Sequence, residues 1–326
     1  MLLYCVCLYF IKNYGKIQQF SVDFAQKIRG KISENGEREF EGLTGIPVCS
    51  RVKTGTKKNT LERKKTKRRE ESMKTGFIGL GIMGRPMAKN LLKAGVDLIV
   101  TDLNKEAVKD VVAAGAQEGT YEEIGKECGV VFIMVPSGDI TKSILFGEGG
   151  VASFIKEGSI VCDMSSVTPV ESKECYERLK EIGVGFVDAP VSGGETGGIN
   201  GTLAIMAGGD QKDFDALKTY FDILGSSALL IGGPGSGSVT KLANQIIVNN
   251  TIAVVSEAFV MAAKAGADPV KVYEAIRGGL AGSAVLDSKI PMIVERNFKP
   301  GGPIRINHKD IKNVVNTAHA IDVPIP

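Results

Sequence analysis

The feature that most constrains this chain is a glycine-rich turn, Gly79-Leu80-Gly81-Ile82-Met83-Gly84. Residues 74–78 before it are a short apolar run that predicts a buried strand, and residues 85–94 after it have the apolar spacing of a helix. Residues 97–101 predict a second strand, which ends at Asp102. A G-x-G-x-x-G turn in this strand–helix–strand–acid context is typical of a dinucleotide-binding unit.

Each part of the turn has a physical purpose in such a unit. Gly79 permits the tight turn, Gly81 lets a pyrophosphate approach the backbone, and Gly84 lets the helix pack closely. The free N–H groups at the helix N-terminus attract phosphate. Asp102 lies 21 residues after Gly81, where a carboxylate can accept from ribose hydroxyls. The alternative is a glycine-rich turn that binds nothing.

Asp102 also bears on the choice of cofactor. A carboxylate at this position disfavours a ribose 2′-phosphate, and the residues that follow, Leu103 and Asn104, supply no arginine to receive one. We therefore expect NAD to be favoured, with NADP possible.

The alternation of strands and helices continues beyond this unit. Further strands are predicted at residues 130–135, 159–164, 185–188, 203–207 and 228–231. Ligands of open α/β sheets lie at the carboxyl ends of the strands. Val135, Pro136 and Ser166 are therefore candidates to line the nicotinamide, although ordinary loop chemistry explains them equally well.

Composition excludes several classes of protein. Residues 1–72 carry a net charge of +8 and the remainder −5, so the larger part of the chain gives no electrostatic case for binding nucleic acid. The six cysteines form no CxxC pair, and with only two histidines we expect no metal site. No stretch has 18 consecutive apolar residues, so we expect no membrane partner.

Two later segments carry candidate chemistry. Ser192-Gly193-Gly194 follows a strand and presents a hydroxyl and consecutive N–H groups, which can hold a carboxylate; the alternative is a flexible turn. Lys241 lies in the first turns of a long apolar helix, where the macrodipole opposes a cation, and it shares a face with Asn244. Lys241 is either a catalytic ammonium of lowered pKa or a side chain that reaches solvent.

A break at residues 232–237 suggests a domain boundary near Pro234. We expect an α/β Rossmann-type domain at 73–234 and an all-α domain at 235–326, which holds substrate and mediates dimerisation. The long helix that opens the second domain is apolar around its circumference, which predicts burial on several sides.

Residues 1–72 are expected to be a disordered or non-native extension. The apolar start, residues 1–11, lacks the flanks of a signal peptide. The basic run at 54–72 is either a nuclear or nucleic-acid tag or a solvated linker. Because Met73 leads directly into the first strand, upstream sequence read in frame is the interpretation that we favour.

Several motifs in a fixed order then point to one family. From Met73 onward the chain resembles the β-hydroxyacid dehydrogenase family, and the likeness rests on GFIGLGIMGRPMAKNLLKAG (76–95), DMSS (163–166), DAPVSGGE (188–195), GTLAIMAGG (201–209), KLANQIIV (241–248), AIRGGLAGSAVLD (275–287), RNFKPG (296–301) and HKDIKN (308–313). Family members continue into further C-terminal helices, so we expect the second domain to be incomplete.

The resemblance implies roles for individual residues. Lys241 matches the catalytic lysine, Ser192, Gly193 and Gly194 match the loop that holds the substrate carboxylate, and Asn244 matches an amide that holds the substrate. Positions that line the cofactor are matched by Met83, Val135, Pro136, Ser166 and Lys309, in addition to the glycine-rich turn.

The resemblance also implies an activity. The run AIRGGLAGS favours members that reduce 2-hydroxy-3-oxopropionate (tartronate semialdehyde) to D-glycerate with NAD(P)H. The alternatives are a dehydrogenase of 3-hydroxyisobutyrate or a related short β-hydroxyacid, and an inactive NAD-binding protein. A cytoplasmic homo-oligomer with a small-molecule substrate is expected.

Overall fold

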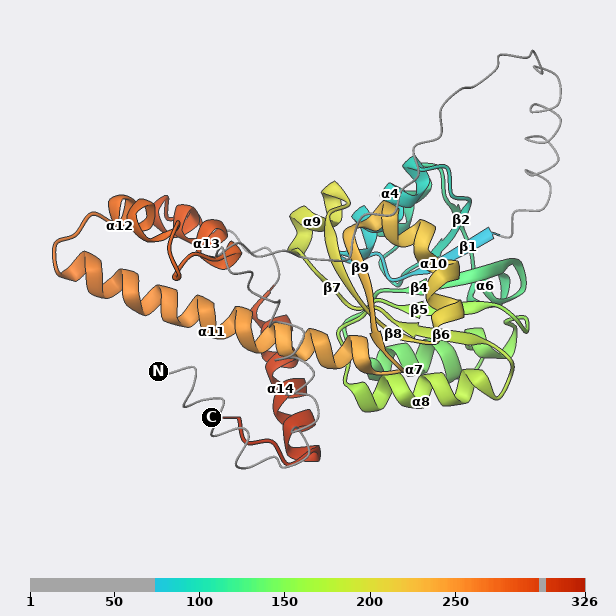
Figure 1. Ribbon diagram of the computed structural model, residues 1–326. Coiled ribbons are helices and arrows are strands. Elements are labelled where there is room, and N and C mark those ends of the chain that lie inside the picture. Colours follow the sequence, from blue (N-terminus) through green and yellow to red (C-terminus); the bar gives the residue numbers. More distant parts are fainter. Residues whose placement is uncertain (1–73, 299–302, 326) are drawn as a thin grey trace, which may run out of the picture. The chain divides into compact units, whose positions relative to one another are not determined.

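The computed structural model describes residues 74–298 and 303–325, and the predictions for residues 1–72 lie outside them. Figure 1 shows a strand-and-helix portion followed by helices alone. The strands are β1 (Lys74–Ile78), β2 (Leu98–Thr101), β3 (Gln117–Glu118), β4 (Cys128–Ile133), β5 (Ile160–Asp163), β6 (Gly185–Asp188), β7 (Val191–Ser192), β8 (Leu203–Gly209) and β9 (Gly225–Gly232).

The strands form one mostly parallel sheet. Its order is β3-β2-β1-β4-β5-β6-β8-β7, and β9 pairs with β8. The first six positions are all parallel, whereas β8 runs antiparallel to β6 and β7. The chain moves outward from β1 to β3 and then returns to place β4 on the other side of β1. This reversal is the topological switch point at which open α/β sheets bind ligands.

Helices cover both faces of the sheet (Figure 1). Around the sheet lie α4 (Gly84–Lys93), α5 (Lys105–Val112), α6 (Tyr121–Glu127), α7 (Gly138–Phe146), α8 (Pro169–Lys180), α9 (Gly194–Asn200) and α10 (Gln211–Leu224). One apolar core joins the sheet to α4, α5 and α10, and a second joins it to α6, α7 and α8. The predicted Rossmann-type α/β arrangement is confirmed.

Local sequence signals explain where these helices begin and end. Thr120 and Thr168 each form a capping box with the glutamate three residues later, which satisfies free N–H groups at the starts of α6 and α8. Gly95 follows α4 with φ of +88°, a conformation that favours glycine. The strands and helices that the sequence predicted are present in the structure, with shifts of one to a few residues at their ends.

The second part of the chain is helical, as expected. It contains α11 (Ser236–Lys264), α12 (Pro269–Ile276), α13 (Ala284–Val294) and α14 (Ile304–Ala320). Phe259, Leu286 and Ile290 form a small core between α11 and α13. The last strand ends at Gly232 and α11 begins at Ser236, and we propose that the domain boundary lies between them.

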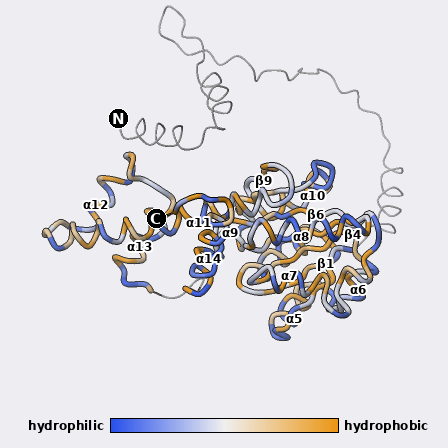
Figure 2. Tube along the Cα trace, turned by 90° about the horizontal axis from the view of Figure 1, so that it is seen from below, coloured by the Kyte–Doolittle hydropathy of each residue, from blue (hydrophilic) through white to orange (hydrophobic). Residues whose placement is uncertain are grey.

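The prediction that α11 is buried on several sides is wrong for the residues that the structure describes. Its buried residues are confined mainly to the first three turns, and its exposed apolar side chains include Val239, Ile247, Val254, Val260 and Met261. High hydropathy favours burial, but it does not supply a covering partner. Figure 2 shows the hydrophobic residues along this helix.

The estimate of membrane-crossing potential also needs correction. One 18-residue window of α11 has a mean hydropathy of 1.7, enough by length and composition to cross a membrane. The count of consecutive apolar residues missed it because Asn, Gln and Thr interrupt the run. Asn249, Asn250 and Thr251 donate to carbonyl oxygens four residues earlier, which satisfies their polar groups on the helix itself. A single helix of this kind is weak evidence for a membrane span.

Candidate active site

The glycine-rich turn joins β1 to α4 at the carboxyl edge of the sheet. Gly79 has φ of +98°, and a Cβ there would collide with the carbonyl oxygen of Met134. A Cβ on Gly84 would collide with the carbonyl oxygen of Gly79, so the start of the helix lies directly against the turn. Gly81 has open space around its Cβ direction and is exposed. These are the three environments that the pyrophosphate-binding interpretation requires.

Asp102 lies just after β2 and holds the turn in place. Its Oδ2 accepts the N–H of Leu80, and its Oδ1 accepts the N–H of Asn104 at 2.6 Å. The carboxylate therefore connects the segments after β1 and β2 through hydrogen bonds that need no bound ribose. Each carboxylate oxygen has a second lone pair with which to accept a hydroxyl. The geometry is compatible with the predicted role of Asp102 in cofactor binding.

The loops after β4 and β5 are tied together in the same way. The Ser165 hydroxyl accepts the N–H of Val135 at 2.9 Å, and the Asp163 carboxylate accepts the N–H of Ser165 at 2.9 Å. Asp163 is fully enclosed, and burial raises the pKa of its carboxyl group. Val135, Pro136 and Ser166 are thereby brought to one edge, beside the switch point between β1 and β4.

The Ser192-Gly193-Gly194 segment runs from β7 into α9. Gly193 and Gly194 have φ of +137° and +62°, and both are exposed. The following helix touches the cofactor turn, because a Cβ on Gly198 would lie 3.5 Å from the Met83 methyl carbon. Asn90 of α4 also donates to the carbonyl oxygen of Gly198 at 2.8 Å. The helix that follows the predicted substrate loop therefore packs against the predicted cofactor turn and its helix.

Lys241 lies in the second turn of α11 and is only 9% exposed. The expectation that it reaches solvent is therefore the weaker of the two interpretations. Burial lowers the pKa of its ammonium group; the Asp310 carboxylate acts in the opposite direction, and Lys309 reinforces the lowering. A lysine whose pKa is lowered by burial gives up its proton more readily than a solvated lysine.

A polar cluster between α11 and α14 surrounds this lysine. Gln245 donates to Asp310 Oδ2 at 2.6 Å, and Lys309 Nζ lies 3.0 Å from Asp310 Oδ1. Lys309 Nζ also donates to the carbonyl oxygen of Ser166 at 2.6 Å. Through Lys309, α14 reaches the loop after β5 and so joins the candidate cofactor positions.

Sequence reasoning did not find two residues of this arrangement. Gln245 is buried beside Lys241, and its i+4 spacing from that lysine was the available signal. Asn244, which was predicted instead, is half-buried and donates to Gln245 Oε1 at 3.0 Å. The second missed residue is Asp188, at the end of β6 and outside this cluster; it opens the motif DAPVSGGE (188–195), but no role was assigned to it. The roles of all these side chains remain proposals.

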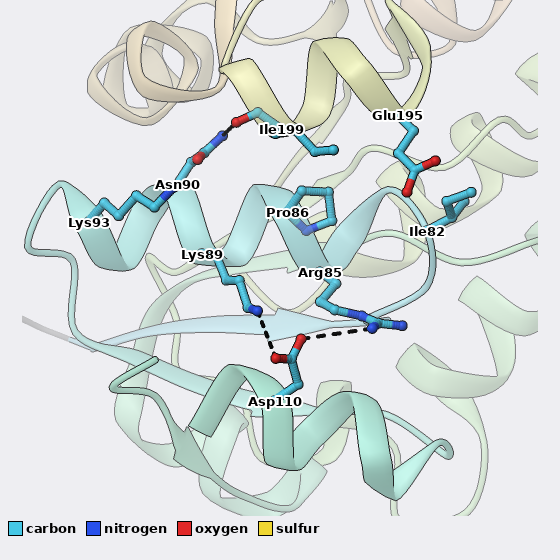
Figure 3. A pocket seen from close by; sticks show the side chains of 9 residues that line it. All are labelled: Ile82, Arg85, Pro86, Lys89, Asn90, Lys93, Asp110, Glu195 and Ile199. Carbon is cyan, nitrogen blue, oxygen red and sulfur yellow. Dashed lines mark hydrogen bonds and ion pairs between the residues drawn. The ribbon is translucent and has the colours of Figure 1, made fainter. Parts of the chain in front are cut away.

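A separate pocket of about 570 Å³ lies beside α4, and its residues are shown in Figure 3. It is lined by Ile82, Arg85, Pro86, Lys89, Asn90, Lys93, Asp110, Glu195 and Ile199. Asp110 pairs with Lys89 at 2.8 Å and with Arg85 at 3.8 Å. Only Ile82 belongs to the predicted site, so we do not place the chemistry here. In residues 74–298 and 303–325 no group of three or more His, Cys, Asp or Glu is placed to hold a metal ion.

Comparison with family models matches both parts of the chain. The model for the NAD binding domain of 6-phosphogluconate dehydrogenase matches residues 74–233. The model for the NAD-binding of NADP-dependent 3-hydroxyisobutyrate dehydrogenase matches residues 235–326. Together they support an NAD(P)-binding protein without deciding between the two cofactors.

Individual relatives agree with these models. A 2-hydroxy-3-oxopropionate reductase of Escherichia coli is 42% identical over 78% of this chain and 87% of its own length. A 2-(hydroxymethyl)glutarate dehydrogenase of Eubacterium barkeri is 34% identical over 79% of this chain and 86% of its own. The solved structure of a 3-hydroxyisobutyrate dehydrogenase from Mycobacterium tuberculosis aligns with a TM-score of 0.72 and 26% identity, covering 78% of this chain and 90% of that one.

Two of the three glycines of the turn, Gly81 and Gly84, give a matched test of the cofactor site. Gly81→Ala should weaken NADH binding by about 10-fold or more, because the added methyl group enters open space that the pyrophosphate needs. The unfolding free energy of this variant should stay within about 0.5 kcal/mol of that of the unaltered protein. Gly84→Ala should lower the unfolding free energy by about 1–3 kcal/mol, because the methyl group meets backbone. Fluorescence titration and denaturant unfolding measure both effects. Unchanged NADH affinity in Gly81→Ala would place the cofactor elsewhere.

Proposed function

The chain belongs to the β-hydroxyacid dehydrogenase family, and from this premise we propose that it reduces 2-hydroxy-3-oxopropionate to D-glycerate, with Lys241 as the proton donor. It is an NAD(P)-dependent oxidoreductase that acts on a CH–OH group. The observation that carries the proposed mechanism is the burial of Lys241 beside the Asp310–Lys309 pair, whose lysine reaches the loop after β5.

The residues of the site divide the work of the reaction. When bound, a reduced nicotinamide cofactor supplies the hydride. The Lys241 ammonium hydrogen-bonds the aldehyde oxygen, stabilises the negative charge that develops on it and donates the proton that completes the alcohol. Lys241 is left neutral and regains a proton from solvent.

Two further groups orient the substrate. Ser192, Gly193 and Gly194 offer a hydroxyl and exposed N–H groups to the substrate carboxylate. The amide of Asn244, one turn after Lys241, holds a substrate oxygen on the same side. Binding at both ends presents one face of the carbonyl for hydride attack.

Substrate choice rests on the relatives and on the glycine-rich run AIRGGLAGS at 275–283. The second candidate is 3-hydroxyisobutyrate or another short β-hydroxyacid, because a solved structure of 26% identity carries that dehydrogenase activity in its name. We favour NADH over NADPH because the Asp102 carboxylate would repel a 2′-phosphate.

We also propose a homo-oligomer that covers the exposed apolar face of α11. Ile247, Val254 and Met261 recur every seven residues and so share one side of the helix, and all three are more than half exposed. Contiguous apolar surface of this kind is characteristic of interaction sites. The expected cytoplasmic location stays a prediction.

A substrate panel tests the proposed function. NADH oxidation is followed with 2-hydroxy-3-oxopropionate, and NAD reduction with 3-hydroxyisobutyrate and D-glycerate, each repeated with the NADP pair. We expect kcat/KM to be highest for the 2-hydroxy-3-oxopropionate/D-glycerate pair and higher with NADH than with NADPH. A higher kcat/KM for 3-hydroxyisobutyrate would favour the second candidate, and no turnover with any of them would contradict the proposal.

Replacing the proposed proton donor tests the mechanism. Lys241→Ala should lower kcat by about 10²–10⁴-fold, because a general acid contributes on that scale. NADH affinity should change little, since the glycine-rich turn and Asp102 are untouched. Lys264→Ala, at the exposed far end of the same helix, is the control and should keep full activity. Stopped-flow kinetics and NADH titration separate the effects, and near-normal kcat in Lys241→Ala would rule out the role.

The pH dependence follows from the direction of the Lys241 pKa. Reduction needs the protonated ammonium, so turnover should fall as pH rises through a pKa that burial holds below 10.5. Oxidation of the alcohol needs the neutral amine and should rise over the same range. Asp310→Asn should move both limbs to lower pH, because the Asp310 carboxylate raises the Lys241 pKa. Limbs that do not move in this variant would show that another group is titrating.

A further inference from the structure

Asp188, the last residue of β6, connects the sheet to the start of α11. Its side chain is 0% exposed, and its two oxygens accept hydrogen bonds from two amides of the helix start. Oδ1 accepts the N–H of Gly235 at 2.8 Å, and Oδ2 accepts the N–H of Ser238 at 2.7 Å. The first turn of a helix has free N–H groups, and a carboxylate is a strong partner for them.

The N-cap residue of α11 cannot satisfy these groups itself. Gly235 has no side chain and adopts φ of +86°. Asp188 therefore replaces the missing cap from a strand that lies 47 residues earlier in the chain. A hydroxyl–hydroxyl contact of 2.9 Å between Ser238 and Ser172 of α8 fixes the same turn from a second direction.

The surrounding packing leaves this contact little freedom. A Cβ on Gly208 would lie 2.7 Å from both Asp188 Oδ1 and the Gly237 nitrogen. A Cβ on Gly237 would collide with the carbonyl oxygens of Met206 and Asp188. The helix start thus lies directly on the ends of β6 and β8, with glycines where any side chain would separate them.

The two sides of this contact lead to the two halves of the proposed site. On the strand side, the chain reaches Ser192 four residues after Asp188. On the helix side, Lys241 follows Ser238 by three residues, which is close to one turn. We propose that Asp188 is a positioning residue, which sets the location and burial of Lys241 relative to the Ser192–Gly194 loop by holding the start of α11. The inference deepens the proposed function and rests on it.

The electrostatics agree with this geometry. Burial raises the pKa of Asp188 to about 7, while the hydrogen bonds from Gly235 and Ser238 favour the carboxylate and lower it. An asparagine in its place would offer its oxygen to one backbone N–H group and its NH₂ group to the other. Because an NH₂ group and an N–H group are both donors, they cannot hydrogen-bond, and the start of α11 must move away from β6.

The test uses Asp188→Asn, with Asp213→Asn as the matched control. Asp213 is a second buried carboxyl, 6% exposed, and lies against Gly185 at the opposite end of β6. The first readout needs no substrate: the rate at which an acylating reagent modifies Lys241, followed by mass spectrometry against pH. Asp310 and Lys309 of α14 are the charged groups that act on Lys241, and neither variant changes them.

In Asp188→Asn we expect the labelling of Lys241 to titrate at a higher pH, because a displaced helix start admits water to the ammonium group. We also expect a higher limiting rate at high pH, where the amine is neutral, because the side chain is more accessible to the reagent. In the same variant kcat should fall by about 10- to 100-fold, on the scale that misplacement of a reacting group produces, while NADH affinity holds. Asp213→Asn should change neither the labelling nor kcat. An unchanged labelling profile in Asp188→Asn, or the same change in both variants, would overturn the inference.

A milder variant covers the case in which Asp188→Asn does not fold. Ser172→Ala removes the hydroxyl contact to Ser238 and a 3.4 Å hydrogen bond to the Thr168 carbonyl oxygen at the start of α8. It should lower kcat by about 3- to 10-fold, on the scale of one lost hydrogen bond. Faster labelling of Lys241 should accompany that fall. A fall in kcat with normal labelling would show that the helix start does not act through the position of Lys241, which would overturn the inference. Lack of turnover in the unaltered protein would instead contradict the proposed function. The two failures are distinguishable because the labelling of Lys241 is measured without substrate.

Discussion

The parallel direction of β1, β4, β5 and β6 is the constraint on which the candidate site depends. Because these strands run the same way, their carboxyl ends share one edge of the sheet. The glycine-rich turn, Val135, Ser166 and the segment leading to Ser192 all follow those ends. Asp102 accepts the N–H of Leu80 and Ser165 accepts the N–H of Val135, so neighbouring loops at this edge are joined by the protein's own hydrogen bonds.

The helical part adds lysine side chains to the carboxylates that lie at the ends of the strands. Lys241 enters from α11 and Lys309 from α14, and the buried Asp310 carboxylate acts on both. Burying one cation costs free energy unless an opposite charge is near. Asp310, held by Gln245, supplies that charge without removing the effect of burial on the Lys241 pKa. The arrangement keeps Lys241 buried beside an opposite charge, with a pKa below its ordinary value.

The sequence predicted those parts of the structure that local rules determine. Gly79, Gly81 and Gly84 each meet a distinct steric requirement at a fixed spacing, so the turn was recognisable. Lys241 was singled out because a cation near a helix N-terminus conflicts with the macrodipole, and its burial agrees with that choice. Asp188 was not found, because its partners Gly235 and Ser238 become neighbours only when the sheet is folded. The burial of α11 was predicted wrongly because high hydropathy favours burial but does not show that another element packs against the helix.

The central claim is that Lys241, the Ser192–Gly194 loop and the nicotinamide meet at one point. A crystal structure with cofactor and an unreactive analogue, in which a carboxylate replaces the aldehyde, tests it most directly. The account predicts one carboxylate of the analogue on the Gly193 and Gly194 amides, and an oxygen of the other about 3 Å from Lys241 Nζ. An analogue bound away from Lys241, for example in the pocket beside α4, would contradict it.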